Sequence, residues 1–147
     1  MPEISPQINR RYSHLLQKVT LARYFKALKL VMAADGISGC EMKAFERGLT
    51  SLGVDSATRK EIDDYVPADK NILRILPEFQ LGSLEARYLV RDAIELASAD
   101  GHYAKAERAM VAKVASLLGV EKEVLAALEA LVELEHSAAN LRRGLLH

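Results

Sequence analysis

The chain has 147 residues, of which half are hydrophobic and 27% are charged, and this composition is typical of a globular protein with one buried core. Its formal net charge is zero, so no overall positive field attracts nucleic acid or an anionic membrane. A single cysteine excludes an intrachain disulfide framework, and no apolar run reaches the roughly 18 residues of a membrane span.

The first residues lack the basic start and apolar core of a signal peptide, so a soluble, cytoplasmic protein is expected. Residues 7–33 contain neither proline nor glycine and predict one amphipathic helix, or two helices with a bend. Its basic stripe consists of Arg11, His14, Lys18, Lys26 and Lys29. Such a stripe is usually a solvated face, and binding of phosphate or acidic groups is the alternative.

Charge is distributed unevenly along the chain. Residues 1–29 hold six Lys or Arg and one acid, a net of +5, so the neutral chain carries −5 in the remainder. This polarity favours electrostatic pairing, either between chains or within one chain.

The turn Asp35-Gly36 is expected to end the first helix, because glycine adopts the left-handed conformation without a steric clash. Ser38 and Glu41 then have the spacing of a capping box, in which each side chain bonds the other residue's backbone amide. They predict the start of a helix over residues 39–52. Gly53 closes that helix in a Schellman-type ending.

A third helix is expected over residues 55–65, and a short apolar one over 69–76 between two prolines. Ser83 is a good N-cap for a helix over residues 84–99. The residues expected on its core face are Leu84, Tyr88, Leu89, Ala93, Leu96 and Ala97.

The second half of the chain repeats the first with one change. Ala99-Asp100-Gly101 repeats Ala34-Asp35-Gly36, and Leu118-Gly119-Val120 repeats Leu52-Gly53-Val54. One residue is inserted after the second turn, and Tyr103 is a poor N-cap, so the capping box there is expected to be lost or redrawn.

A last helix is expected over residues 121–139, with fraying over 140–147. Its apolar residues cover a wider sector of the helix surface than one core-facing stripe. It is therefore either the central helix of the core or a helix with an exposed side that supports dimerisation or partner docking.

No segment alternates apolar and polar residues as a strand does, so the fold class is all-α with about six or seven helices. We expect a single domain over residues 1–147. Two pseudo-repeated three-helix units, over residues 7–65 and 83–139, are joined by residues 66–82 and share one core.

Four acidic residues form the candidate metal site: Asp35, Glu41, Asp100 and Glu107. Their carboxylates could supply oxygen ligands to a divalent cation, although neither turn contains the EF-hand pattern. The structural alternative is that each aspartate bonds backbone amides of its turn and each glutamate complements a helix start.

No other pattern indicates chemistry. His14, His102, His136 and His147 lack metal-binding spacing, and the thiol of Cys40 has no neighbouring histidine. There is no glycine-rich phosphate loop and no nucleic-acid-binding motif. We therefore expect no catalytic residue, no cofactor-binding residue, no enzyme activity and no nucleic-acid partner.

The repeated alanine-aspartate-glycine turns, the glutamate after each, and the helix endings on leucine-glycine-valine resemble the TerB-like family of tellurite-resistance proteins. The stretch from Ala99-Asp100-Gly101 through Glu107 to Leu118-Gly119-Val120 is most similar, and the resemblance covers about residues 16–135. It implies an all-helical fold of pseudo-repeated helices. It also implies a binding or scaffolding role in stress-response or envelope-associated systems, with metal binding suspected for some members.

The chain is therefore expected to act as a non-enzymatic interaction or scaffolding module that binds protein partners, and a homodimer is one expected form. The alternative is a divalent-metal-binding stress protein, similar to tellurite-resistance proteins, that uses the acidic residues at the two turns.

Overall fold

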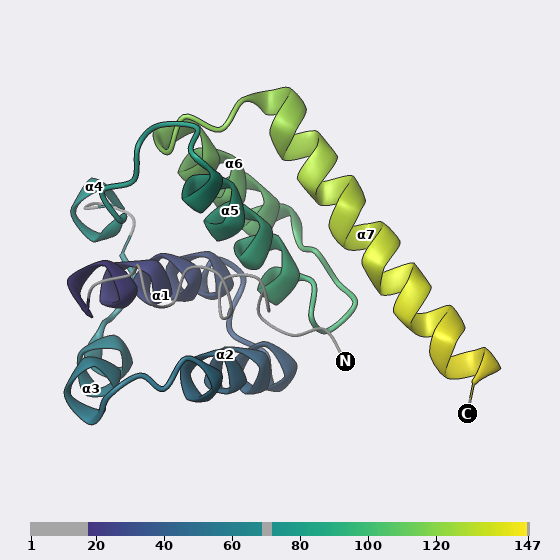
Figure 1. Ribbon diagram of the computed structural model, residues 1–147, viewed down its shortest axis with the longest axis horizontal. Coiled ribbons are helices and arrows are strands. Elements are labelled where there is room, and N and C mark those ends of the chain that lie inside the picture. The colour runs from purple at the N-terminus through teal and green to yellow at the C-terminus, as the bar shows by residue number, and fades with distance from the viewer. Residues whose placement is uncertain (1–17, 69–71, 147) are drawn as a thin grey trace.

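The computed structural model describes residues 18–68 and 72–146, and within these ranges all regular structure is helical (Figure 1). The all-α prediction is confirmed. The seven helices of the described residues are α1 (Lys18–Ala33), α2 (Gly39–Ser51), α3 (Ser56–Asp64), α4 (Ile72–Ile75), α5 (Leu84–Ala97), α6 (Lys105–Leu117) and α7 (Lys122–Leu145).

The glycine turns have the expected conformation. Gly36 and Gly101 follow α1 and α5 with φ angles of 77° and 87°. At the end of α2, Val54 N–H donates to the Leu49 carbonyl at 3.2 Å. At the end of α6, Val120 N–H donates to the Ala115 carbonyl at 2.8 Å. Both helices therefore end in the predicted Schellman motif.

Helix α5 is the centre of the molecule. Ten of its 14 residues are buried, and it contacts α1, α2, α6 and α7. Leu89, Leu96 and Ala97 lie in the core as expected, whereas Leu84 is 48% exposed and its prediction is wrong. Leu84 is the first residue of α5.

Helix α7 differs most from its prediction. It is helical through Leu145, so fraying from residue 140 onward is wrong. Only Val132 is buried among its 24 residues, so α7 is a peripheral helix and α5 takes the central position. Figure 1 shows its C-terminal half extending past the other helices. Strong helix propensity and the basic Arg142 and Arg143 near the negative end of the helix dipole account for the added length.

The described part of the basic stripe binds within the chain. Lys26 Nζ lies 2.8 Å from the Glu61 carboxylate, and Lys29 Nζ donates to the carbonyls of Ile62 and Asp63 at the end of α3. These cations attach α3 to α1. Arg11, His14 and the side chain of Lys18 lie outside the described residues.

No helix among the described residues is both long enough and apolar enough to cross a membrane.

The two Schellman glycines, Gly53 and Gly119, offer a matched test of how closely the end of α6 packs against residues 81 and 82. A Cβ added at Gly119 would lie 2.7 Å from Leu81 Cβ and 3.0 Å from the Gly82 nitrogen, whereas one added at Gly53 meets no atom within 4 Å. Both glycines have positive φ, so alanine brings backbone strain at each site. We expect Gly53→Ala to lower the free energy of unfolding by about 1 kcal/mol, and Gly119→Ala by about 2–4 kcal/mol. Urea unfolding of both variants measures the difference, and equal losses would contradict this close packing.

Candidate functional site

The first turns of α2 and α6 each bury a glutamate. Glu41 is 2% exposed and Glu107 is 3% exposed. Burial of a carboxyl group is costly unless hydrogen bonds or charges compensate it. The two side chains therefore need partners, and the local fold supplies one to each.

Each glutamate caps its own helix. Glu41 Oε1 accepts from the Ser38 amide at 3.1 Å, and the Glu41 amide donates to the Ser38 hydroxyl at 3.1 Å, as the capping box predicts. At α6 only one of the two hydrogen bonds of a capping box is present. Ala104 is the N-cap and has no hydroxyl, but its amide still donates to Glu107 Oε1 at 3.2 Å. The inserted residue lengthens the loop and leaves this bond in place.

The fold also brings the two carboxyl groups together. The Oε2 atom of each is buried, and no hydrogen-bond donor of the described residues reaches it. Burial, a hydrogen bond with the Glu41 carboxyl and the negative charges of Glu41 and Asp100 together raise the pKa of Glu107 to about 8, and the hydrogen bond from the Ala104 amide opposes them. Glu107 therefore keeps its proton at neutral pH, and this proton is the donor that joins the two carboxyl groups, so we call it the shared proton.

The two turn aspartates do not complete this pair. Asp100 is exposed and its Oδ1 accepts from the His102 amide at 2.9 Å, which is the structural alternative foreseen for it. Asp35 is exposed at the first turn. Of the four predicted metal ligands, the structure therefore joins Glu41 and Glu107 directly, and Asp100 acts on Glu107 through its charge.

The arrangement supplies two carboxyl groups for chemistry. Over residues 18–68 and 72–146, no group of three or more His, Cys, Asp or Glu side chains has a metal-binding arrangement. Hard cations take six to eight oxygens, so the protein alone does not enclose one. The pair can hold a proton, or it can give two oxygens to a cation that keeps its remaining water ligands.

A second polar cluster was missed by the sequence reasoning. It lies on α5, where Arg91, Asp92 and Glu95 are all buried. Tyr24 on α1 donates to Asp92 at 2.6 Å, and Arg91 lies 3.4 Å from the same carboxylate. The helix over residues 84–99 is expected to bury only its apolar face, so its charged side chains are expected to be exposed to solvent. At 100° per residue, positions 91, 92 and 95 share one side of the helix within about 100°, which is the pattern of a solvated polar face, so the sequence carried no signal that they are buried.

The same cluster holds α7 in place. Arg91 Nη2 lies 3.0 Å from Glu135, and Glu95 lies 3.1 Å from His136 Nε2. Burial raises the pKa of the Glu95 carboxyl, and the charges of Arg91 and His136 oppose this shift. Two polar side chains of α7 are thus attached to two buried charges of α5.

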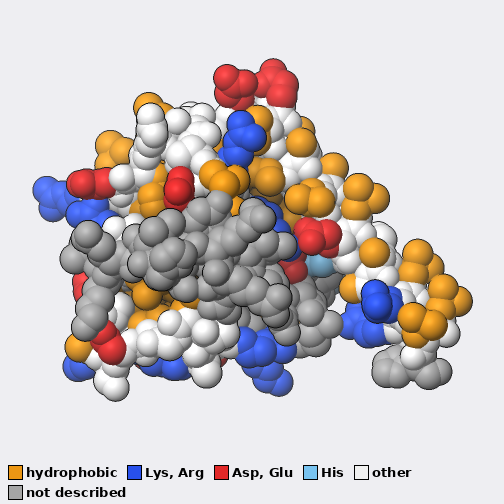
Figure 2. Space-filling model, viewed as in Figure 1, with side chains coloured by type: hydrophobic (Ala, Val, Ile, Leu, Met, Phe, Trp, Pro, Cys, Tyr) orange, Lys and Arg blue, Asp and Glu red, His pale blue; other side chains and the backbone are white. Residues whose placement is uncertain are grey.

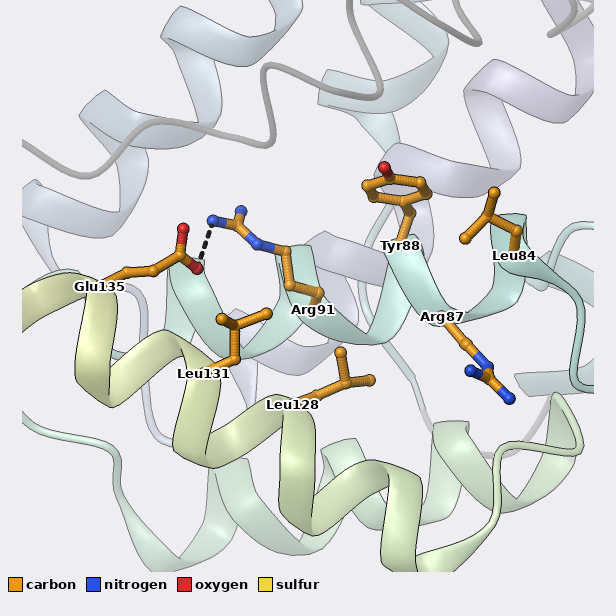
Figure 3. A pocket seen from close by; sticks show the side chains of 7 residues that line it. All are labelled: Leu84, Arg87, Tyr88, Arg91, Leu128, Leu131 and Glu135. Atoms are coloured by element: carbon orange, nitrogen blue, oxygen red, sulfur yellow. Dashed lines mark hydrogen bonds and ion pairs between the residues drawn. The ribbon is translucent and has the colours of Figure 1, made fainter.

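Beside these contacts, α5 and α7 form an open groove of about 350 Å³ (Figure 3). Its lining residues are Leu84, Arg87, Tyr88, Arg91, Leu128, Leu131 and Glu135. In Figure 3, Leu128 and Leu131 point from α7 toward α5, and the Arg91–Glu135 pair closes one end. The wrong expectation for Leu84 is explained here, because this side chain lines the groove.

The remaining candidates stay apart from both clusters. Cys40 is exposed at the start of α2, and His102 is exposed after the second turn. His14 and His147 lie outside the described residues.

Comparisons with known proteins support the family and the fold. The model of the family described as tellurite resistance protein TerB matches residues 24–130. The fold is similar to the crystal structure of a tellurite resistance protein from Nostoc punctiforme, with a TM-score of 0.68 and 26% sequence identity. That similarity covers 86% of this chain and 79% of the other. No curated protein matches the chain.

The carboxyl pair predicts a pH dependence of stability. A folded-state pKa of about 8 for Glu107 lies above that of an unfolded glutamate, so folding takes up a proton between about pH 5 and pH 8. Stability contributed by this proton is complete at low pH and is lost as pH rises through 8. Glu107→Gln keeps an oxygen for the Ala104 amide and needs no proton. We expect its free energy of unfolding relative to wild type to rise by about 1–3 kcal/mol from pH 5 to pH 9.

Urea unfolding at several pH values measures this difference. Glu123→Gln, at an exposed position in the first turn of α7, is the control and should follow the wild-type pH profile. Parallel profiles for Glu107→Gln and wild type would show that the two carboxyl groups hold no shared proton.

Proposed function

We propose that this chain, which belongs to the TerB family, acts as a non-enzymatic protein-interaction module, and that it does so in the cytoplasm within a stress-response or envelope-associated system. The observation that carries the proposal is the exposed apolar side of α7. Leu131, Leu134, Leu141 and Leu145 are 45–76% exposed on one helix. Figure 2 shows hydrophobic side chains gathered along α7 at the right of the molecule.

The anchoring of α7 supports this proposal. Its inner side is held by the contacts of Glu135 and His136 with α5 and by the ion pair of Arg108 with Glu129, at 3.0 Å. Because these polar contacts fix the helix, its leucines cannot turn inward without breaking them. A fixed helix with an exposed apolar side is a recurrent mode of protein recognition.

The carboxyl pair favours a second candidate function, the binding of a divalent cation. Glu41 and Glu107 each have a buried oxygen that no donor of the described residues reaches. A cation that displaces the shared proton would use both oxygens. Its affinity would rise with pH, because the proton competes with it.

The interaction proposal predicts a loss of partners when the apolar side of α7 becomes polar. Leu134→Gln/Leu141→Gln changes two exposed leucines and should leave the fold intact. In affinity purification from native lysate, we expect wild type to retain proteins that this variant loses. Ala112→Gln/Ser116→Gln, at two exposed positions of α6, is the matched control and should behave as wild type. Identical protein sets from all three chains would refute α7 as the docking surface.

The cation proposal has a separate readout. Millimolar Mn²⁺ or Mg²⁺ should raise the melting temperature of wild type by a few degrees at pH 8.5 and by less at pH 6. Glu107→Gln should lose this response while remaining folded, and Glu123→Gln should keep it. A response that is equal in Glu107→Gln and wild type would place the cation elsewhere.

A further inference from the structure

The exposed apolar side of α7 has a regular period. It consists of Ala127, Leu131, Leu134, Ala138, Leu141 and Leu145, and all six are exposed. Their spacing alternates between four and three residues over almost three heptads. This is the a/d pattern of a coiled-coil seam, in which apolar residues of two helices interlock. We call these six residues the α7 seam.

Apart from Leu131, which points toward α5, the α7 seam lies on the side of the helix away from its buried residue. At 3.6 residues per turn it is centred roughly 140° around the helix from Val132, the buried residue of α7. Leu131 continues it into the groove between α5 and α7. A second helix could therefore lie along the seam without disturbing the contacts of Glu135 and His136 with α5.

The charges of α7 select the occupant and its direction. Residues 121–135, which include the N-cap and the N-terminal part of α7, hold five acidic residues and one lysine, a net charge of −4. Its last turn holds Arg142 and Arg143. Two copies of α7 in antiparallel orientation would place each basic end beside the acidic half of the other copy. A parallel pair would place like charges together.

We propose that a second copy of this chain docks on the α7 seam, forming an antiparallel two-helix interface. The symmetric register places Leu131 level with Leu141 of the other copy and Leu134 level with its Ala138. Ala127 then lies level with Leu145 of the other copy. The inference rests on the proposed function, because it names the partner of the same surface. Its seam is shorter than that of a typical stable coiled coil, so the association depends on concentration.

Self-association is measured by sedimentation velocity from about 5 to 500 μM. We expect a concentration-dependent dimer for wild type, and at least a tenfold higher dissociation constant for Leu134→Gln/Leu141→Gln. Ala112→Gln/Ser116→Gln should dimerise as wild type does. A chain that stays monomeric over the whole range would overturn the inference.

Disulfide capture tests the direction. In a Cys40→Ser background, chains with Ala127→Cys are mixed with chains with Leu145→Cys and oxidised. The two positions are about 27 Å apart on one helix, because 18 residues rise 1.5 Å each. Antiparallel docking predicts the mixed disulfide as the main product. Preferential linkage of each variant to itself would indicate a parallel pair and would contradict the inference.

The outcomes also separate this inference from the proposed function. If the chain is monomeric and the seam variant still loses proteins in affinity purification, the seam docks a different partner. The second-copy inference then fails and the interaction proposal stands. If the variant loses neither self-association nor any protein, both fail.

Discussion

The structure depends on the burial of α5, a helix that carries three charged side chains into the core. Arg91, Asp92 and Glu95 could not remain there without partners, because an uncompensated buried charge costs several kcal/mol. Tyr24 supplies one partner from α1, and Glu135 and His136 supply two from α7. The positions of α1 and α7 are therefore set by polar contacts to α5 as well as by apolar packing.

This constraint explains the two-sided character of α7. Its inner side satisfies the charges of α5, and its outer side keeps leucines in solvent. A helix needed only for the core would bury its apolar residues, and a helix needed only for solubility would not repeat them at heptad spacing. The combination is understandable if the same helix completes the fold of one chain and contacts another.

The carboxyl pair shows how a local motif acquires a tertiary role. Glu41 and Glu107 are each explained by the capping of a helix, a task that needs only residues three positions away. Packing of the two helix starts brings the second oxygen of each into the same buried space. There the pair is either a shared-proton contact or a set of two ligands, and both uses follow from one desolvated geometry.

The sequence by itself determined the local structure. The all-α class, the capping box at Ser38, the left-handed glycines and both Schellman endings follow from interactions within a few residues, and these were predicted with their positions. Tertiary structure alone decided that α5 is central and α7 peripheral, that Leu84 is exposed, and that Glu41 meets Glu107 while Asp35 stays apart. Periodicity identifies the apolar residues of a helix but not the surface that will cover them. That depends on contacts between residues far apart in the chain, such as the 41 positions between Glu95 and His136.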